Sequence, residues 1–348
     1  MPNTSFSWAV IGAGPAGIAA VGKLLDQRIE PKKILWIDPE FKVGDFGTKW
    51  RNVSSNTRIE LFTKYFEECL SFEYNASPDT FKIKKSDASK TCFLSLAAEP
   101  LQWITDHLKH KIHPVMGKVE HLKLYNRHWQ ITLKDKIYSA QNVIVATGAE
   151  PKSLNFPNVE EISLYTALNP DKLRSACHKE DVVAVFGASH SAVIIIKSLL
   201  ENTNVKKIIN FYLSPLRYAV YFDDWILFDD TGLKGTTAEW ARENIDGKLP
   251  AKLERVISNE ENIRTILPLC HKAIYATGFQ KRLIPVEGMQ SLEYNDRSGI
   301  IAPGLFGFGI AFPEAKLDRY GTLEYRVGLW KFMQYLNHVM PVWLNYGA

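Results

Sequence analysis

The sequence contains little cysteine: its 348 residues include only four, Cys69, Cys92, Cys177 and Cys270. None of them forms a C-x-x-C or C-x4-C pair, so the chain lacks the dithiol centre that thiol–disulfide exchange requires. Structural disulfides are not expected either, because we expect the protein in the cytoplasm, where thiols stay reduced.

Long apolar runs are also missing. The longest candidate, Val182–Ile196, is interrupted by a glycine, two serines and a histidine, and it is shorter than a membrane-spanning helix. An apolar strand, Trp8–Ile11, follows Met1 closely and runs into glycines, without the basic start and the cleavage site of a signal peptide. We therefore expect a cytoplasmic protein with no membrane partner.

Charge of one sign is not in excess. Lys and Arg total 42 and Asp and Glu total 38, which leaves a net charge of +4 with no long run of like charge. An extended nucleic-acid surface is therefore not expected. His107, His110 and His113 have a spacing that could suit a metal, but Pro114 follows them and lysines separate them. We interpret these histidines as a solvated helix end and predict no metal site.

A glycine-rich turn stands near the N-terminus, in the sequence SWAVIGAGPAG at Ser7–Gly17. An apolar strand leads into this turn and an amphipathic helix follows it. A second apolar strand, Ile34–Ile37, then ends in Asp38. This order of strand, turn, helix and strand is typical of a dinucleotide-binding unit rather than of a chance match to a glycine pattern.

Each glycine of the turn has a separate task in such a unit. Gly12 permits the tight turn, Gly14 lets a diphosphate approach the backbone, and Gly17 lets helix and strand pack closely. The helix N-terminus supplies free N–H groups for the phosphates. Asp38, at the end of the second strand, could accept hydrogen bonds from both hydroxyls of a ribose. The alternative is a tight glycine turn that binds no ligand.

The same pattern occurs a second time. Asp181–Leu200 reads DVVAVFGASHSAVIIIKSLL, and a second apolar strand follows it. Gly187 stands 175 positions after Gly12, and Ala192 stands at the same distance after Gly17. Because a chain of this length usually forms two domains, we predict one dinucleotide-binding fold in each.

Two differences distinguish the second unit. Ser189 stands where the first unit has Gly14, so its side chain restricts approach to the backbone, although its hydroxyl could itself bond a phosphate. The second strand ends without an acid, and Ser214 and Arg217 follow it. These two residues could bind a ribose 2′-phosphate, which favours NADPH over NADH. A vestigial fold without a nucleotide is the alternative.

The stretch Gly187–Ser191 (GASHS) also resembles the G-x-S-x-G nucleophile elbow of α/β-hydrolases, which is likewise a strand–turn–helix. Its last residue is a serine where the elbow has glycine, and a hydrolase would not need the glycine-rich turn at Gly12. A hydrolase is therefore the weakest interpretation.

Further segments follow a recognisable order. Apolar strands that end in Ala-Thr-Gly occur at Asn142–Gly148 and within Lys272–Phe279. Alternating apolar residues between positions 117 and 138 predict a small antiparallel meander. Near the C-terminus comes a G-x-G stretch that ends in Gly309, and a long amphipathic helix is predicted from about residue 323 to residue 338.

In this order of motifs the chain resembles the two-dinucleotide-binding-domain flavoproteins of the glutathione-reductase-like superfamily, over nearly its whole length. The resemblance implies an α/β fold with two Rossmann-like three-layer domains and a small antiparallel meander. The NAD(P)-binding domain, residues 151–277, would be inserted into a discontinuous FAD-binding domain formed by residues 1–150 and 278–348.

Within the superfamily the chain is more similar to the flavin-containing monooxygenases than to the disulfide reductases. Val43–Trp50 resembles the G-G-x-W stretch of these monooxygenases. Val53–Thr57 resembles their V-x-x-N-T segment, whose asparagine, Asn56 here, sits near the reactive flavin ring. The F-x-G-x-x-x-H-x-x-x-F/Y signature of N-hydroxylating and Baeyer–Villiger types is absent from Tyr165–Lys179, which leaves the named activity open.

The resemblance also concerns the C-terminal part. Gly309-Ile310 stands where disulfide reductases carry Gly-Asp on the flavin ribityl chain. The helix predicted to begin near Leu323 would point its N-terminus at the flavin and stabilise negative charge on the reduced ring.

The candidate cofactor-binding residues fall into two groups, one for each nucleotide. Those for FAD are Gly12, Gly14, Pro15, Ala16, Gly17, Asp38, Pro39, Trp50, Asn56, Val119, Ala146, Thr147, Gly148, Gly309 and Ile310. Those for NADP are Gly187, Ser189, His190, Ser191, Ala192, Ser214, Arg217, Thr277 and Gly278.

The function implied is that of an FAD-dependent oxidoreductase that takes a hydride from NADPH and is monooxygenase-like, with Asn56 as the catalytic candidate. The alternative for Asn56 is an ordinary loop asparagine. An FAD reductase or oxidase without oxygenation is a second interpretation, and a flavin-bound binding or regulatory protein with a degenerate NADP site is a third.

Two features bear on partners without identifying any. Tyr218–Ala238 carries two pairs of aspartates, which fit solvated loop acids better than catalytic acids, with a lid or subunit contact as further options. Aromatic residues near the C-terminus, such as Trp343 and Tyr346, suit either a core or a homodimer interface. No segment identifies the small-molecule substrate.

Overall fold

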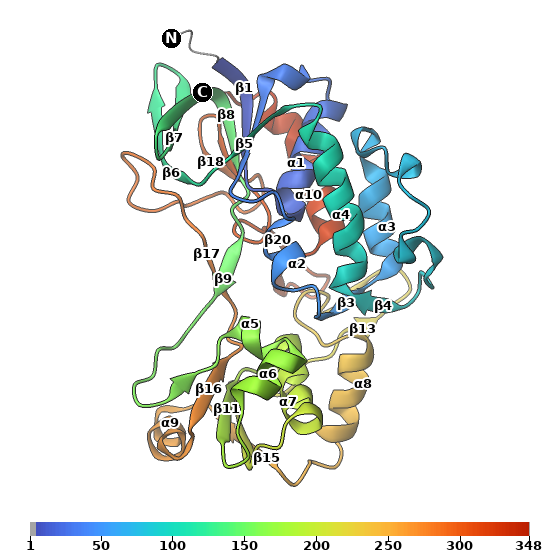
Figure 1. The fold of residues 1–348 in the computed structure, drawn as a ribbon, viewed down its shortest axis with the longest axis vertical. Helices are drawn as coiled ribbons and strands as arrows, with labels where there is room; N and C mark the ends of the chain where they lie inside the picture. Colours follow the sequence, from blue (N-terminus) through green and yellow to red (C-terminus); the bar gives the residue numbers. More distant parts are fainter. Residues whose placement is uncertain (1–4, 348) are drawn as a thin grey trace. The chain divides into compact units, whose positions relative to one another are not determined.

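A computed structural model describes residues 5–347 and divides them into two compact units. Unit 1 comprises residues 5–51, Thr57–Ala149 and 281–347, and unit 2 comprises Asn52–Asn56 and Glu150–Gln280. In Figure 1 unit 1 contains the blue, teal and red segments, whereas most of unit 2 is drawn from green to orange. The middle of the sequence is therefore inserted into a unit that both ends of the chain build.

Unit 1 contains an eight-stranded sheet whose main path has the order β18-β19-β8-β1-β2-β5. The neighbours along this path are parallel, except that β18 runs antiparallel to β19. The strands β6, β7 and β8 form the predicted antiparallel meander. The bounds are β1 (Ser5–Ile11), β2 (Ile34–Asp38), β5 (His113–Met116), β6 (Val119–Tyr125), β7 (His128–Leu133), β8 (Lys136–Val145), β18 (Ile300–Ala302) and β19 (Leu305–Gly307).

Both faces of this sheet are buried. Val10 packs on the face that carries the helices, whereas its neighbours Ala9 and Ile11 pack on the opposite face, against the meander. This alternation follows from the two-residue period of a strand. Figure 1 shows α1, α4 and α10 together on one face of the sheet. The helices are α1 (Pro15–Asp26), α2 (Gly44–Thr48), α3 (Ile59–Glu68), α4 (Leu94–Lys109) and α10 (Leu329–Trp343).

Unit 2 contains a five-stranded parallel sheet of order β10-β16-β11-β12-β15. Phe186, Phe211 and Tyr275, from three neighbouring strands, pack together on one of its faces. The strands are β10 (Glu160–Glu161), β11 (Val182–Phe186), β12 (Lys207–Tyr212), β15 (Leu253–Ile257) and β16 (Lys272–Tyr275). The helices are α5 (Leu164–Ala167), α6 (Pro170–Ala176), α7 (His190–Asn202), α8 (Gly235–Asn244) and α9 (Glu260–Ile266).

The remaining elements are short. The other strands are β3 (Ser54–Arg58), β4 (Thr91–Phe93), β9 (Ala149–Pro151), β13 (Val220–Tyr221), β14 (Ile226–Leu227), β17 (Phe279–Lys281), β20 (Glu314–Leu317) and β21 (Leu323–Arg326). Single turns of 3-10 helix occur at Pro31–Lys33, Leu70–Phe72, Tyr74–Ala76, Lys82–Lys85 and Leu267–Leu269. The strands β9 and β17, at the two ends of the inserted segment Glu150–Gln280, pair with each other.

The prediction of a helix from residue 323 to residue 338 is wrong at its start. Leu323–Arg326 forms β21, which pairs antiparallel with β20, and α10 begins only at Leu329. The residue before α10 is Gly328, with a φ of +137°, a conformation that L-residues rarely adopt and that interrupts a helix. The predicted position of a helix N-terminus near Leu323 is therefore withdrawn.

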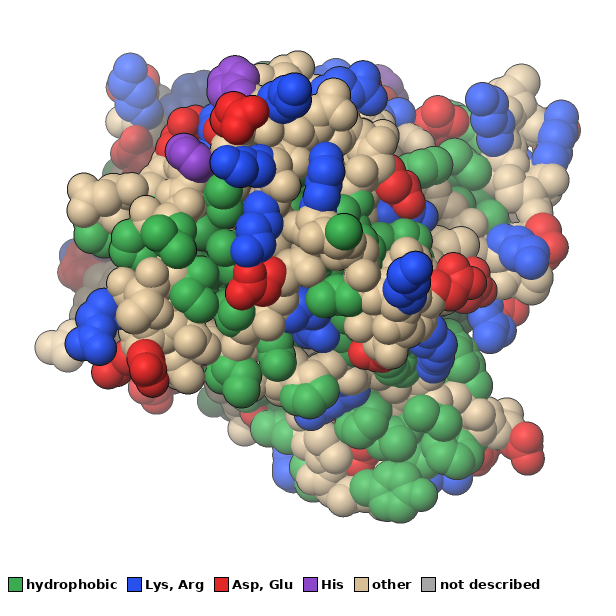
Figure 2. All heavy atoms as spheres, turned by 90° about the horizontal axis from the view of Figure 1, so that it is seen from below, with side chains coloured by type: hydrophobic (Ala, Val, Ile, Leu, Met, Phe, Trp, Pro, Cys, Tyr) green, Lys and Arg blue, Asp and Glu red, His purple; other side chains and the backbone are tan. Residues whose placement is uncertain are grey.

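The surface and the helices give two further facts. Figure 2 shows Lys and Arg side chains interspersed with Asp and Glu on the face that it draws, which agrees with the small net charge of +4. Between residues 5 and 347, no helix combines the length and apolar character that crossing a membrane requires.

Candidate functional site

The first glycine turn follows β1 at the carboxyl edge of the unit 1 sheet. Gly12 has a φ of +111°, and its N–H donates a 2.8 Å hydrogen bond to the Ile37 carbonyl. A Cβ on Gly12 would lie 2.3 Å from the carbonyl oxygen of Ala146, and one on Gly17 would lie 1.9 Å from the carbonyl oxygen of Gly12. Contacts within the protein are thus sufficient to require glycine at both positions.

Gly14 has no such requirement. Its φ of −75° and ψ of 177° suit any residue, and a Cβ there would meet no atom of residues 5–347 within 4 Å. Gly14 also caps α1 without any side-chain hydrogen bond, so no side chain occupies the N-terminus of this helix. An uncapped helix N-terminus beside open space is suited to bind a phosphate.

Asp38 ties the turn to the neighbouring strand. Its Oδ2 accepts a 2.7 Å hydrogen bond from the Ala13 N–H, and its Oδ1 accepts from the N–H groups of Glu40 and Phe41 at 2.9 and 2.7 Å. The residue is 8% exposed. These three bonds use most of the acceptor capacity of a carboxylate. Asp38 therefore positions the glycine turn, and its predicted bond to a ribose stays a prediction, as does a contact from Pro39.

Three predicted segments meet around this turn. The Ala146 N–H donates to the Ile11 carbonyl at 2.8 Å, which places the first Ala-Thr-Gly beside Gly12. Gly309 has a φ of +84°, and a Cβ there would lie 2.5 Å from the Cβ of Ala16, in the first turn of α1. Ile310, next to it, is 39% exposed. The sequence motifs at residues 12–17, 146–148 and 309–310 thus form one surface.

Arg282 and Asp45 belong to the same surface, and sequence reasoning missed both. Thr147 Oγ1 donates to the Arg282 carbonyl at 2.6 Å, and the Arg282 N–H donates to the Gly148 carbonyl at 3.1 Å. The Arg282 guanidinium pairs with the carboxylate of Asp45 in α2, a short contact between two partly buried side chains. The only signal in the sequence was the place of Arg282, four residues after Gly278.

The remaining FAD candidates have less distinctive surroundings. Pro15 accepts a 2.5 Å hydrogen bond from the hydroxyl of Tyr65, and burial raises the pKa of that phenol well above its usual range. The backbone N–H of Trp50 donates to the Asp45 carbonyl, and Val119 is buried at the start of β6. Asn56 is exposed on β3, within the short segment that clusters with unit 2, and its predicted catalytic role stays a prediction.

The second turn, in unit 2, repeats the geometry of the first. Gly187 has a φ of +123°, and its N–H donates to the Phe211 carbonyl at 2.8 Å. A Cβ on Gly187 would lie 2.5 Å from the Ala276 carbonyl oxygen, and the Cβ of Ala192 would be 3.4 Å away. The resemblance between the two halves of the sequence is therefore matched in three dimensions.

The N-terminus of α7 carries the predicted nucleotide candidates. Ser189 caps this helix with extended backbone and no side-chain hydrogen bond, and it is exposed. The Nε2 of His190 lies 3.3 Å from the Ser54 carbonyl, whereas its Nδ1 is buried without a partner among residues 5–347. Burial lowers the pKa of His190. Thr277 Oγ1 is likewise buried and unpartnered within this described part, next to Gly278, whose surroundings are open.

The strand β12 in unit 2 corresponds to β2 in unit 1 but does not end in an acid. In unit 1 the last residue of β1 pairs with Ile37, and in unit 2 the last residue of β11 pairs with Phe211. The next residue, Tyr212, therefore stands where unit 1 has Asp38. Ser214 and Arg217 follow and are exposed. The Arg217 guanidinium lies 4.6 Å from the centre of the Phe228 ring.

The interpretation of three histidines as a helix end holds only in part. His107 lies in the last turn of α4, where its Nε2 is 3.3 Å from the carboxylate of Glu73, and His110 follows the end of this helix. His113 is exposed but begins the strand β5, so its assignment to a helix end is wrong. In the acidic segment, β13 and β14 form a short hairpin, and Asp229 pairs with Lys234. Residues 5–347 contain no group of three His, Cys, Asp or Glu side chains that could hold a metal.

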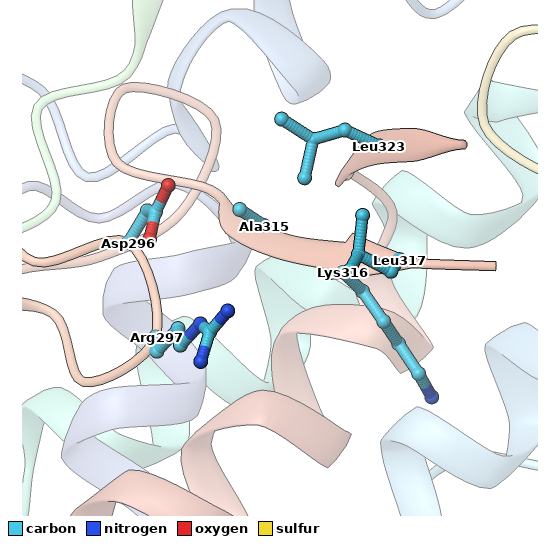
Figure 3. A pocket seen from close by; sticks show the side chains of 6 residues that line it. All are labelled: Asp296, Arg297, Ala315, Lys316, Leu317 and Leu323. Carbon is cyan, nitrogen blue, oxygen red and sulfur yellow. The ribbon is translucent and has the colours of Figure 1, made fainter. Parts of the chain in front are cut away.

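Unit 1 also contains a pocket of about 460 Å³, whose lining residues lie between positions 296 and 323. Figure 3 shows Leu317 and Leu323 on the two strands of the β20–β21 hairpin and the charged pair Asp296 and Arg297 on a separate loop. None of the predicted cofactor residues lines this pocket.

Comparison with known proteins identifies the family. The sequence pattern of the pyridine nucleotide-disulphide oxidoreductase family matches residues 9–209, more than half of the chain. The monooxygenase AgnR1 of Paecilomyces divaricatus is 34% identical over 381 aligned positions, which cover 96% of this chain and 97% of that protein.

Solved structures share the fold at lower identity. A flavin-containing monooxygenase from Stenotrophomonas maltophilia is 15% identical with a TM-score of 0.63, covering 98% of this chain and 99% of its own. An ornithine N-hydroxylase from Kutzneria sp. 744, 12% identical, has a TM-score of 0.67 over 98% of this chain and 99% of its own. The bacillithiol disulfide reductase of Staphylococcus aureus, also 12% identical, has a TM-score of 0.61 and covers 98% of both chains. The chain therefore belongs to the pyridine nucleotide-disulphide oxidoreductase family and is an FAD-dependent oxidoreductase of its monooxygenase-like branch.

Proposed function

We propose that unit 1 binds FAD at the first glycine turn, that unit 2 binds NADPH, and that the enzyme oxidises NADPH to drive oxygenation of a small molecule. The observation that carries the proposal is the open space beside Gly14. Packing explains the glycines at 12 and 17, but no contact in the described part of the chain explains the one at 14. A ligand that approaches the backbone there explains it, and the uncapped end of α1 selects an anion.

The residues of unit 1 then have distinct tasks. Gly14 and the first turn of α1 hold the diphosphate, and Asp38 keeps the turn in place through its bond to Ala13. Gly309 lies against Ala16 and so brings the C-terminal segment to the same ligand. The cofactor, when bound, supplies hydride acceptance and oxygen chemistry, while the protein fixes its orientation and the surrounding charge.

Arg282 lies at the same surface, beside the first Ala-Thr-Gly. It is held by hydrogen bonds of its backbone to residues 147 and 148, and its guanidinium pairs with Asp45. Because Asp45 balances its charge, Arg282 would contribute N–H donors and a fixed position to a cofactor site rather than a net positive charge. Asn56 is proposed as the residue beside the reactive ring, on the sequence resemblance alone.

NADPH is proposed for unit 2 because its turn repeats the first one while its strand end has no carboxylate. An acid at that position would repel a ribose 2′-phosphate. The ornithine N-hydroxylase that shares this fold was solved with reduced FAD, NADP⁺ and L-ornithine. The exposed Ser189 hydroxyl is available to bond a phosphate.

The test uses the purified protein loaded with FAD. Under anaerobic conditions, NADPH should bleach the flavin absorbance; absence of bleaching would refute electron transfer from the nucleotide to the flavin. Air is then admitted, and peroxide is measured per NADPH consumed with and without candidate substrates. A substrate that lowers the peroxide yield and appears as an oxygenated product supports a monooxygenase, whereas full conversion to peroxide with every substrate supports an oxidase.

Three further proposals concern location and partners. We infer a cytoplasmic protein, because all four cysteines are unpaired within the described part of the chain. We infer that it acts on a small molecule without a nucleic-acid partner. A homodimer is proposed on the aromatic C-terminal segment only, and size-exclusion chromatography with light scattering tests it.

A further inference from the structure

Arg255, in the middle of β15, lies beside the strand end that corresponds to Asp38. In unit 1 this position holds a carboxylate, and in unit 2 the register places Tyr212 there. The guanidinium carbon of Arg255 lies 4.3 Å from the centre of the Tyr212 ring. A cation from the neighbouring strand is thus stacked on the aromatic ring that replaces the anion of the first unit.

A single buried amide connects this cation to the glycine turn. Asn210, 1% exposed, donates from Nδ2 to the carbonyl oxygens of Gly187 and Val185 at 2.8 and 3.0 Å. Its Oδ1 accepts a 3.0 Å hydrogen bond from Arg255 Nε. In unit 1 the corresponding residue, Trp36, makes only the bond to the glycine carbonyl. The turn that would hold the diphosphate and the guanidinium of Arg255 are therefore fixed with respect to each other.

The guanidinium of Arg255 is only partly satisfied within residues 5–347. The ion pair on β15 joins Glu254 to Lys207 and does not include Arg255, and one terminal nitrogen of Arg255, Nη2, is buried without a hydrogen-bond partner in this part of the chain. Burial lowers the pKa of Arg255, and the charge of Asp246, whose carboxylate accepts a hydrogen bond from the Tyr218 hydroxyl, offsets this only in part. A half-buried guanidinium with an unsatisfied nitrogen is costly, and an anionic ligand would reduce that cost.

We propose that Arg255 binds the ribose 2′-phosphate of NADPH and makes unit 2 selective for NADPH over NADH. The proposal deepens the proposed function and rests on it. Its planar guanidinium suits a phosphate, and Nε would remain on Asn210 while the terminal nitrogens would donate to the ligand. Arg217, the residue that the sequence suggested for this task, is instead exposed and lies over Phe228.

The test is a calorimetric titration of the FAD-loaded protein with NADP⁺ and, separately, with NAD⁺, which differ by this phosphate alone. Arg255→Gln should weaken the affinity for NADP⁺ by about 10- to 100-fold, the range for loss of a charge-assisted hydrogen bond. The affinity for NAD⁺ should stay within roughly twofold. Arg264→Gln, at an exposed arginine on α9 of the same unit, is the matched control and should leave both affinities close to wild type. Arg217→Gln tests the residue that the sequence suggested. Arg255→Lys should fall between, because an ammonium keeps the charge but lacks the planar fork of a guanidinium.

Each outcome is decisive. Equal weakening of NADP⁺ and NAD⁺ in Arg255→Gln, with an unchanged flavin content and melting temperature, would overturn the assignment. Selective loss of NADP⁺ in Arg217→Gln would move the task to that residue and also overturn it. If the wild-type protein bound neither nucleotide, the proposed nucleotide site of unit 2 would itself fail. A selective loss confined to the Arg255 variants would support the proposal.

Discussion

Replacement of Gly14 by alanine should separate ligand binding from folding. The backbone at Gly14 has a conformation open to alanine, and the added methyl group would meet no atom within 4 Å among the residues that the structure describes. Folding should therefore be unaffected, or stabilised by up to about 1 kcal/mol, because alanine restricts the unfolded chain. The methyl group would, however, occupy the space that we assign to the diphosphate.

The expected loss of FAD affinity follows from the hydrogen bonds that the methyl group would lengthen. One hydrogen bond from a backbone N–H to a phosphate contributes about 1.5 to 3 kcal/mol, so Gly14→Ala should raise the dissociation constant by about 10- to 100-fold. Fluorescence titration of the FAD-free protein measures this constant, and thermal unfolding of the same preparation measures stability.

Gly12→Ala is the matched control for folding. Its methyl group would lie 2.3 Å from the Ala146 carbonyl oxygen, at a φ of +111°. The steric and backbone strain together should cost about 3 kcal/mol, which lowers the melting temperature of the FAD-free protein by roughly 6 to 12 °C. If Gly14→Ala bound FAD as tightly as wild type with normal stability, the open space would not be the phosphate site, and the reasoning would be refuted.

Three further predictions concern other residues. Asp38→Asn should reduce the free energy of urea unfolding of the FAD-free protein by about 1.5 to 3 kcal/mol, because the amide nitrogen cannot accept the backbone hydrogen bonds that one carboxylate oxygen accepts in the wild type. The control Glu40→Gln, at an exposed residue, should change this free energy by less than about 0.5 kcal/mol. Equal effects of the two substitutions would contradict the positioning role of Asp38. Burial lowers the pKa of His190, so the unfolded chain binds more protons as the pH falls below about 6.5 and wild-type stability decreases there. His190→Gln should lose less stability over that range, by at most about 1.4 kcal/mol per pH unit, and an unchanged slope in urea titrations would argue against a neutral, buried His190. Burial raises the pKa of Cys92, Cys177 and Cys270 to about 11, so iodoacetamide at neutral pH should leave NADPH-dependent bleaching intact, and its loss would point to an essential thiol.

The glycine turns and their strands could be predicted because local sequence determines them. A turn with a φ near +110° at Gly12 and Gly187 needs glycine whatever surrounds it, and the apolar strand before each turn is buried on both faces. The spacing of the glycines and apolar residues is therefore sufficient to predict the fold of both halves without knowledge of tertiary contacts.

The start of α10 could not be predicted from apolar periodicity. Leu323 pairs with Leu317 across a hairpin, a contact that depends on the folded chain. This strand ends at Arg326, and Gly328 directly precedes the helix. The residues after Gly328 do show the expected helical pattern. The error arose because one apolar pattern was extended across a glycine.

Arg255, Asn210 and Arg282 were missed for a related reason. Arg255 lies in the sequence LERVI, where a charged residue on a partly exposed strand attracts no attention. The pairing of β12 with β15 places Arg255 beside Tyr212 and Asn210, and this position is the reason for proposing a role for it. No short-range sequence pattern predicts the register of the two strands. Arg217 was chosen because it is near the strand end in sequence, whereas Arg255 is near it in space.

The most direct test of the account is the flavin content of the purified protein. Denaturation of a known amount of protein releases its noncovalent ligands, and chromatography identifies and quantifies them. We predict about one FAD per chain, bound through the turn at Gly12 and Gly14. Colourless protein that releases no FAD, and that takes up none when FAD is added, would contradict the account.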